Sequence, residues 1–174
     1  DDWVARALRQ IEDSAEDAAR TVARLQEFTR DRQEGSPEPV DLASVAREAV
    51  ELTKSVWRDR IQSGGGSIEL ELDLKPAAPV LGSFSELVEV ATNLVANAAD
   101  AMPSGGKIWV STLQKEEEVF LTVRDNGTGM NPEVKSKIFF PFFTTKGKRG
   151  TGLGLSMAYG VVTRHRGEIA VQSE

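Results

Sequence analysis

Two asparagines one helical turn apart, Asn93 and Asn97, lie where apolar spacing predicts a helix over residues 84–101. Asparagine is a mediocre helix former, and its amide oxygen suits Mg²⁺, a hard ion that keeps waters and shares phosphate oxygens. The pair therefore predicts a metal site for a phosphorylated ligand, with a solvated helix face as the alternative. The asparagines belong to one continuous polar line, at offsets of 3, 7, 11 and 14 residues from its first member: Glu86, Glu89, Asn93, Asn97 and Asp100.

A glycine-rich turn follows an apolar strand predicted at 118–124. Asp125 opens the turn, and Gly127 and Gly129 come after it. A carboxylate in this place can accept a hydrogen bond from an exocyclic amine such as that of adenine, and the glycines let the backbone approach a base closely. The alternative is an ordinary strand-end turn, for which this sequence is also common.

A basic, glycine-rich segment, residues 146–155, leads into a predicted helix. Glycine amides at a helix N-terminus form an anion site that the helix dipole reinforces. The segment is therefore a candidate phosphate lid, and a flexible loop without a ligand is the alternative. It is not a dinucleotide-binding fingerprint, because its lead-in is polar and basic instead of an apolar strand. The chain has no P-loop either, because that motif needs Ser or Thr after its Gly-Lys pair. Here Lys107 and Lys148 are followed by Ile108 and Arg149.

The scaffold that must position these segments alternates strands and helices without repeats, which predicts an α/β or α+β fold. An Asp41 N-cap with a Val40–Val45 staple opens one helix, and a Ser83–Glu86 capping box opens the next. Asn131 and Pro132 predict a further short helix. The predicted strands are 68–74, 107–113, 118–124 and 168–172, and the longer helices are 42–62, 84–102 and 155–165.

The first 33 residues predict a separate long helix, because apolar residues recur at three- and four-residue steps and the other face is charged. A single helix cannot bury such a stripe by itself, so it needs a partner. The Gly- and Pro-containing stretch after residue 34 breaks this helix. We therefore divide the chain into a stalk at 1–34, a linker at 35–40 and a globular domain at 41–174.

Composition narrows the function classes. The 174 residues are 40% hydrophobic and 28% charged, as in soluble globular proteins. A net charge of −6 argues against sequence-independent nucleic-acid binding. The absence of cysteine excludes disulfides and thiolate metal sites. No apolar run of about 18 residues occurs, so we expect no membrane contact by this fragment and a cytoplasmic location, although its parent could be membrane-anchored.

Four segments together resemble the conserved boxes of sensor histidine kinases, in the family's order and spacing. The short lid is similar to that of the nitrogen-regulator branch, and residues 1–33 resemble the second helix of the dimerisation hairpin. The resemblance covers roughly residues 40–174. The N, G1, F and G2 boxes correspond to residues 93–98 (NLVANA), 125–130 (DNGTGM), 138–146 (IFFPFFTTK) and 150–155 (GTGLGL).

This resemblance implies a Bergerat-type two-layer sandwich with a mixed sheet, binding ATP and Mg²⁺. Asn97 would be the principal metal ligand with Asn93 nearby, and Glu89 would lie near the transferred phosphate. Asp125 would hold adenine N6, and Gly129, Met130 and Ile138 would line the base. The remaining nucleotide contacts would come from Ala101, Gly127, Thr144, Thr145, Lys146, Gly150, Thr151, Gly152, Leu153, Gly154 and Leu155.

The family transfers the ATP γ-phosphate to a histidine on the first stalk helix, for relay to a response regulator. That helix is absent here, and the chain's one histidine, His165, is expected at a helix end where the dipole favours it. The expected partners are therefore a histidine-bearing helix, a receiver domain and a second copy bound through residues 1–33. The alternatives are an ATP-sensing module, a serine kinase or an ATPase of the same superfamily. Asn93 disfavours the ATPase, because those enzymes place a glutamate base there.

Overall fold

The computed structural model describes residue 3 and residues 37–62, 66–147 and 150–173. The chain divides into two compact units, Asp1–Gln33 and Glu34–Glu174. Apart from Trp3, the predicted stalk helix lies outside the described residues, and the architecture that follows is that of the second unit.

The central sheet of this unit has three strands in the order β2-β4-β5. Strand β2 (Ile68–Leu74) pairs in parallel with β4 (Gly106–Lys115), and β4 pairs antiparallel with β5 (Glu118–Asp125), so the sheet is mixed as expected. The tight turn between β4 and β5 places Glu116 at a φ of 53°. Both strands of this hairpin extend slightly beyond their predicted bounds.

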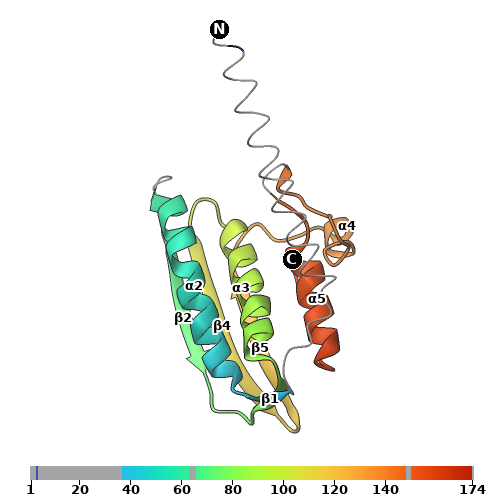
Figure 1. Cartoon of the computed structure of the whole chain (residues 1–174). Helices are drawn as coiled ribbons and strands as arrows, with labels where there is room; N and C mark the ends of the chain where they lie inside the picture. The colour runs from blue at the N-terminus through green and yellow to red at the C-terminus, as the bar shows by residue number, and fades with distance from the viewer. Residues whose placement is uncertain (1–2, 4–36, 63–65, 148–149, 174) are drawn as a thin grey trace. The chain divides into compact units, whose positions relative to one another are not determined.

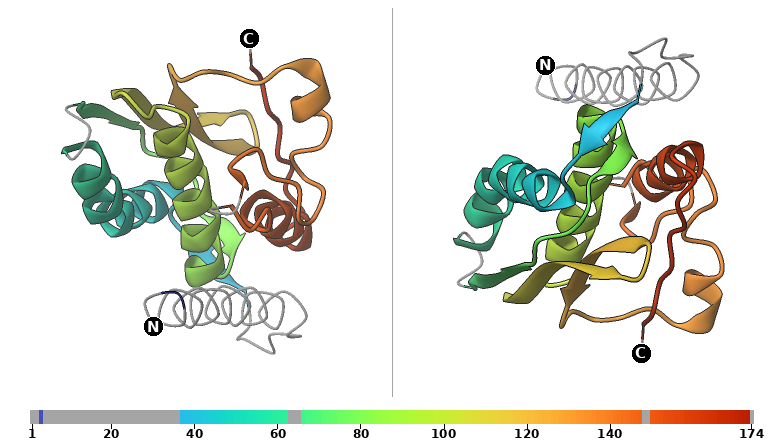
Figure 2. Two further views of the ribbon diagram at one scale, coloured as in Figure 1. Left: turned by 90° about the horizontal axis from the view of Figure 1, so that it is seen from above. Right: turned by 90° about the horizontal axis from the view of Figure 1, so that it is seen from below.

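Two helices, α2 (Leu42–Gln62) and α3 (Phe84–Asp100), cover one face of the sheet (Figures 1 and 2). Helix α5 (Gly154–Arg164) packs beside α3, and the short α4 (Pro132–Lys135) lies between β5 and the lid. The alternation of apolar residues in β4 explains the layers, because Ile108 and Val110 point at the helices and are almost fully buried. The main core cluster joins sheet and helices: Ala46, Val50, Val95, Ala98, Ala99, Met102, Ile108 and Val110.

The predicted start of α2 is present. The Asp41 carboxylate accepts hydrogen bonds from the backbone N–H groups of Ala43 (3.0 Å) and Ser44 (3.2 Å). The Ser44 hydroxyl also donates to it at 2.7 Å, and this bond is the largest influence lowering the pKa of Asp41. Val40 and Val45 are both buried in one cluster, so the hydrophobic staple is confirmed.

The capping box at the start of α3 forms only in part. The Ser83 hydroxyl accepts from the Glu86 N–H at 3.4 Å, as predicted. The reciprocal acceptor for the Ser83 N–H is not Glu86 but Nε2 of His165, at 3.0 Å. Glu86 instead pairs with Arg164 at 2.9 Å. His165 therefore lies at the end of α5 as expected, but it acts as a cap for α3 from across the fold.

The ring nitrogens of His165 lie beside the Val161 carbonyl, the Ser83 N–H and, at 3.7 Å from Nε2, the Glu86 carboxylate. Nδ1 lies 2.9 Å from the Val161 carbonyl, to which it donates, and Nε2 accepts from Ser83. A Cβ at Gly82 would collide with the ring, so the strand end and the histidine are in close contact. His165 thus caps the end of α5, as expected, and also forms a specific bond between the two helices that carry the N and G2 boxes.

We expect His165→Ala to lower the free energy of unfolding by about 1–3 kcal/mol, because the part-buried Ser83 N–H loses its acceptor. Chemical denaturation measures this. Arg164→Ala is the matched control, because it breaks the neighbouring ion pair with Glu86. The Arg164 side chain is 57% exposed, so this variant should lose less than about 1 kcal/mol of unfolding free energy. An equal, small loss in both variants would contradict the capping role.

Three features differ from the sequence expectation. Strands β1 (Glu38–Val40) and β3 (Val80–Gly82) form a two-stranded antiparallel sheet that was not predicted, and β1 occupies the end of the expected linker.

The strand expected at 168–172 is wrong, because those residues run without regular secondary structure. Ile169 still packs on the cluster between α3 and α5. Period-two alternation predicts which side chains face inward, but not whether a neighbouring strand bonds to the segment.

Among the described residues, no helix combines the length and apolarity needed to cross a membrane.

Candidate nucleotide site

Three of the predicted boxes meet at the C-terminal half of α3. The polar line on this helix contacts other segments: Glu86 pairs with α5, while Asn97 and Asp100 contact Lys146, the last residue of the F box. Residues 143–147, where the F box runs into the lid and called the lid segment below, approach from one side. The G1 turn, residues 125–129, approaches the end of the same helix. The helix is thus the common support of the site.

The lid contacts α3 through Lys146. Its Nζ donates to Asn97 Oδ1 at 2.8 Å and to Asp100 Oδ2 at 2.7 Å. Both side chains are partly exposed, with 38% of Lys146 and 32% of Asp100 accessible. Asp100 was part of the polar line but was not assigned to the nucleotide. Its spacing of three residues from Asn97 is the signal that places it on the same face.

The G2 segment approaches α3 at Asn93. A Cβ at Gly154, the first residue of α5, would lie 2.8 Å from the Asn93 amide oxygen. Gly154 therefore allows the N-terminus of α5 to reach the N box. Leu153 is buried, and its carbonyl accepts the Ser156 hydroxyl at 2.9 Å. The free amides of this helix start and the Asn93 side chain are consequently neighbours.

The G1 turn rests on the C-terminal cap of α3. The Thr128 N–H donates to the Ala101 carbonyl at 3.1 Å, and a Cβ at Gly127 would lie 2.6 Å from that oxygen. Within the turn, the Gly127 N–H donates to Asp125 Oδ1 at 2.8 Å, which fixes the orientation of the carboxylate. The structure thus brings Ala101, Asp125 and Gly127 together.

The turn continues into the base-lining candidates. Gly129 has a φ of 65°, and the Met130 N–H donates to the Ser173 hydroxyl at 2.8 Å. Asn131 caps α4 through the Val134 N–H at 2.8 Å, as predicted. Ile138 is 6% exposed. The C-terminal residues thus help to hold the G1 turn, a contact that nothing in the sequence indicated.

The lid has a closed stem. The Phe142 N–H donates to the Gly152 carbonyl at 3.0 Å, and both residues have a positive φ, 67° and 66°. At the base of the lid segment, the Lys146 N–H donates to the Thr144 hydroxyl at 3.1 Å. A Cβ at Gly150 would collide with this hydroxyl. Thr144, predicted to contact the nucleotide, therefore organises the lid turn in this structure.

The remaining predicted residues are Glu89, Thr145, Thr151 and Leu155. Glu89 is half-buried on α3, four residues before Asn93, and Thr151 is half-buried beside the lid stem. Thr145 is exposed. Leu155 follows Gly154 in the first turn of α5 and is half-buried. Their places are compatible with the expected site, but their side chains do not define it.

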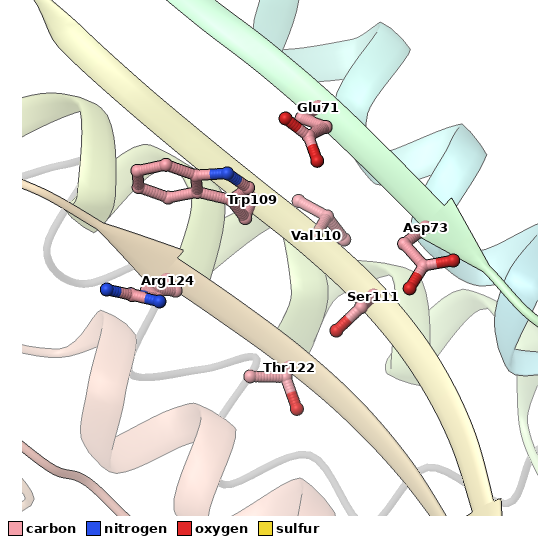
Figure 3. A pocket seen from close by; sticks show the side chains of 7 residues that line it. All are labelled: Glu71, Asp73, Trp109, Val110, Ser111, Thr122 and Arg124. Carbon is pink, nitrogen blue, oxygen red and sulfur yellow. The ribbon is translucent and has the colours of Figure 1, made fainter.

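A groove of about 230 Å³ lies on the opposite face of the sheet (Figure 3). Its central side chain, Trp109, has the cations of Lys107 and Arg124 at 5.4 and 5.1 Å from the ring centroid. Lys107 also bonds Glu71 at 2.8 Å, which is the largest influence lowering the pKa of that carboxyl. None of the predicted site residues lines this groove. Its lining residues are Glu71, Asp73, Trp109, Val110, Ser111, Thr122 and Arg124.

Comparison with known sequences identifies the family. Residues 82–174 match the family model described as Histidine kinase-, DNA gyrase B-, and HSP90-like ATPase. The sensor kinase CckA of Brucella abortus is 38% identical over 186 residues, which cover 96% of this chain and 19% of that protein. The signal transduction histidine-protein kinase AtoS of Escherichia coli is 32% identical over 155 residues, covering 88% of this chain and 24% of that protein. The chain thus spans about a fifth of the length of these relatives.

Solved structures agree with the sequence comparison. The mycobacterial sensor histidine kinase MprB superposes with a TM-score of 0.62 at 32% identity, over 75% of this chain and 80% of that chain. The catalytic domain of histidine kinase ThkA superposes with a TM-score of 0.64 at 29% identity, over 75% and 82%. The chain belongs to the histidine kinase-, DNA gyrase B- and HSP90-like ATPase family, and its globular unit has the fold of the ATP-binding catalytic domain of sensor histidine kinases.

Proposed function

We propose that this chain binds ATP with Mg²⁺ and donates the γ-phosphoryl group to a histidine on a dimerisation helix that it does not itself contain. The carrying observation is that the G2 segment, the lid and the G1 turn contact Asn93, Asn97 and Ala101, at the C-terminal half of α3 and its cap, where the N box lies. Segments separated by up to about fifty residues in the sequence thus meet on one helix face, with the chemical groups that a nucleotide requires.

The side chains fit a hard cation. Asn97 Oδ1 and Asp100 Oδ2 already bind one positive group, the Lys146 ammonium. Among the described residues, no cluster of three His, Cys, Asp or Glu side chains forms. An ion held by Asn97 would therefore complete its shell with phosphate and water oxygens, as Mg²⁺ does. When bound, Mg²⁺ would neutralise charge on the phosphates.

The proposed reaction breaks the bond between the γ-phosphorus and the β–γ bridging oxygen and forms a phosphorus–nitrogen bond to the acceptor imidazole, with ADP as leaving group. Catalysis of this kind is mostly positioning and charge stabilisation. Asn93, Asn97 and Glu89 would orient the phosphates and metal, and the amides at the start of α5 would bind phosphate oxygens. His165 is a poor acceptor, because both its ring nitrogens are engaged.

We expect Asp125→Asn to weaken ADP binding by about 1–3 kcal/mol, because an amide can present a donor to the adenine amine where the carboxylate presents an acceptor. Asp125 Oδ1 is already held by the Gly127 N–H, so the substitution should leave the turn in place. Calorimetry with ADP and with adenosine measures the loss, which should be similar for both ligands. Equal affinity of variant and parent chain would remove Asp125 from the base site.

Transfer itself is tested with a separately supplied first stalk helix of the full-length parent and γ-labelled ATP. Acid-labile label on that helix supports histidine phosphorylation. Acid-stable label would favour a serine kinase, and release of inorganic phosphate alone would favour an ATPase. ATP binding without transfer would favour an ATP-sensing module. Acid-labile label on His165 of this chain would contradict the assignment of the acceptor.

The relatives' class suggests the wider setting. ThkA is described in complex with a response regulator protein, TrrA. We propose that the phosphoryl group passes to such a receiver domain, that the chain associates with a second copy through residues 1–33, and that it acts in the cytoplasm. The net charge of −6 supports protein partners over nucleic acid.

A further inference from the structure

The Lys146 side chain lies where the proposed metal would bind. Its ammonium is 2.8 Å from Asn97 Oδ1, the oxygen proposed for Mg²⁺, and 2.7 Å from Asp100 Oδ2. An amide oxygen that already accepts a short, charge-assisted bond from an ammonium has to exchange one cation for another. An ammonium and a divalent ion that both contacted this oxygen would lie close together and repel each other.

Asp100 makes this contact an ion pair. Asn97 alone would offer a neutral acceptor, whereas the carboxylate three residues later compensates the charge of the lysine. The residues lie on one face of α3, so both reach the same ammonium. The lysine of the lid is therefore held on the helix by one neutral and one anionic oxygen.

The lid is built so that the contact of Lys146 with α3 helps to fix its position. Its stem is closed by the bond between Phe142 and Gly152, and the Thr144 hydroxyl orders the turn that carries Lys146. Beyond that turn, Gly147 has a φ of 57°, and a Cβ there would meet nothing within 4 Å. The lid segment thus has a fixed base, and the contact of Lys146 with α3 ties its far part.

We propose that Lys146 and Asp100 form a latch that holds the lid on the metal ligand, so that binding of a Mg²⁺–nucleotide must release it. This regulation rests on the proposed function of the site. When a nucleotide enters, its phosphates offer Lys146 a new anionic partner, and Asn97 becomes available to the metal. Asp100 is then a positioning residue that sets the affinity for Mg²⁺–nucleotide by stabilising the lid in its latched position.

The test compares parent chain and Asp100→Asn, with Glu51→Gln as the control. Glu51 pairs with Lys54 on α2 at 3.0 Å and takes no part in the site. The Lys54 side chain is about as exposed as that of Lys146. Asp100→Asn keeps the shape of the side chain and removes its charge. We expect Mg²⁺–ADP to bind about two- to fivefold more tightly to this variant, the scale of a partly exposed ion pair. Adenosine, which has no phosphates, should bind unchanged, and Glu51→Gln should match the parent.

Hydrogen exchange provides a reading that needs no nucleotide. In the nucleotide-free protein, amides of residues 143–147 should exchange faster in Asp100→Asn than in the parent or in Glu51→Gln. In a Lys146→Ala background, Asp100→Asn should have no further effect on either measurement, because the two residues act as one unit.

Several results would overturn the latch. Unchanged exchange in residues 143–147 would show that Asp100 does not hold the lid. Weaker Mg²⁺–ADP binding in Asp100→Asn would instead make Asp100 a supporting partner of the metal. A parent chain that binds no ADP would refute the proposed function and with it the regulation, whereas failure of the latch alone would leave normal ADP binding.

Discussion

Replacing Asn97 by Ala should weaken ATP binding at least about tenfold in the presence of Mg²⁺ and change it little in its absence. The amide oxygen is the proposed metal ligand. Even substitution of residues that only hydrogen-bond to a metal ligand changes metal affinity by about 10- to 100-fold. Without Mg²⁺, the variant loses only one of the two oxygens that hold Lys146. Calorimetric titrations with ATP, in Mg²⁺ and in a chelator, measure the two values.

Asn97→Asp is the matched control for this experiment. It keeps an oxygen at the same place, so binding should remain dependent on Mg²⁺, although the added negative charge lies closer to the phosphates. Equal losses with and without Mg²⁺ in the alanine variant would instead assign Asn97 to folding or to direct contact with the nucleotide. Phosphotransfer to a supplied stalk helix should fall in parallel with the Mg²⁺-dependent affinity.

The elements could be predicted from the sequence where local signals were strong. The Asp41 cap and the alternation of β4 and β5 each depend on neighbours within a few residues, and the helix and strands they imply are present. The short strands β1 and β3 were missed because three-residue segments carry too little pattern to be recognised. They form only because residues some forty positions apart are brought together by the helix α2 and the strand β2 between them.

Long-range contacts within the site could not be foreseen for the same reason. The sequence indicated which residue types could hold metal, base and phosphate, and the structure places many of them around one end of α3. It did not indicate that Lys146 would contact Asn97, or that Ser173 would support Met130. His165 shows the point most clearly. Its helix-end position was predictable, whereas its bond to Ser83, 82 residues away, depends on how α3 and α5 pack.

The stem of the lid should be the most sensitive point of the site to a single added methyl group. Gly152 has a φ of 66°, and a Cβ there would collide with the backbone of Phe142. Gly147, in the same lid, has a φ of 57°, but a Cβ there would meet open space. Alanine at both positions carries a comparable left-handed backbone penalty, about 1–2 kcal/mol, so any difference between them measures the collision.

We expect Gly152→Ala to lower the free energy of unfolding by about 1–3 kcal/mol more than Gly147→Ala does. This is the usual range for forcing atoms into a filled space. The Phe142–Gly152 bond should open, so amides flanking it should exchange faster, and affinity for Mg²⁺–ATP should fall further than for adenosine. Denaturation, hydrogen exchange and calorimetry on the two variants measure these effects. Because the backbone conformation is matched, equal behaviour of both variants would mean that Phe142 can move aside freely, and that the bonded stem does not hold the lid over the phosphates.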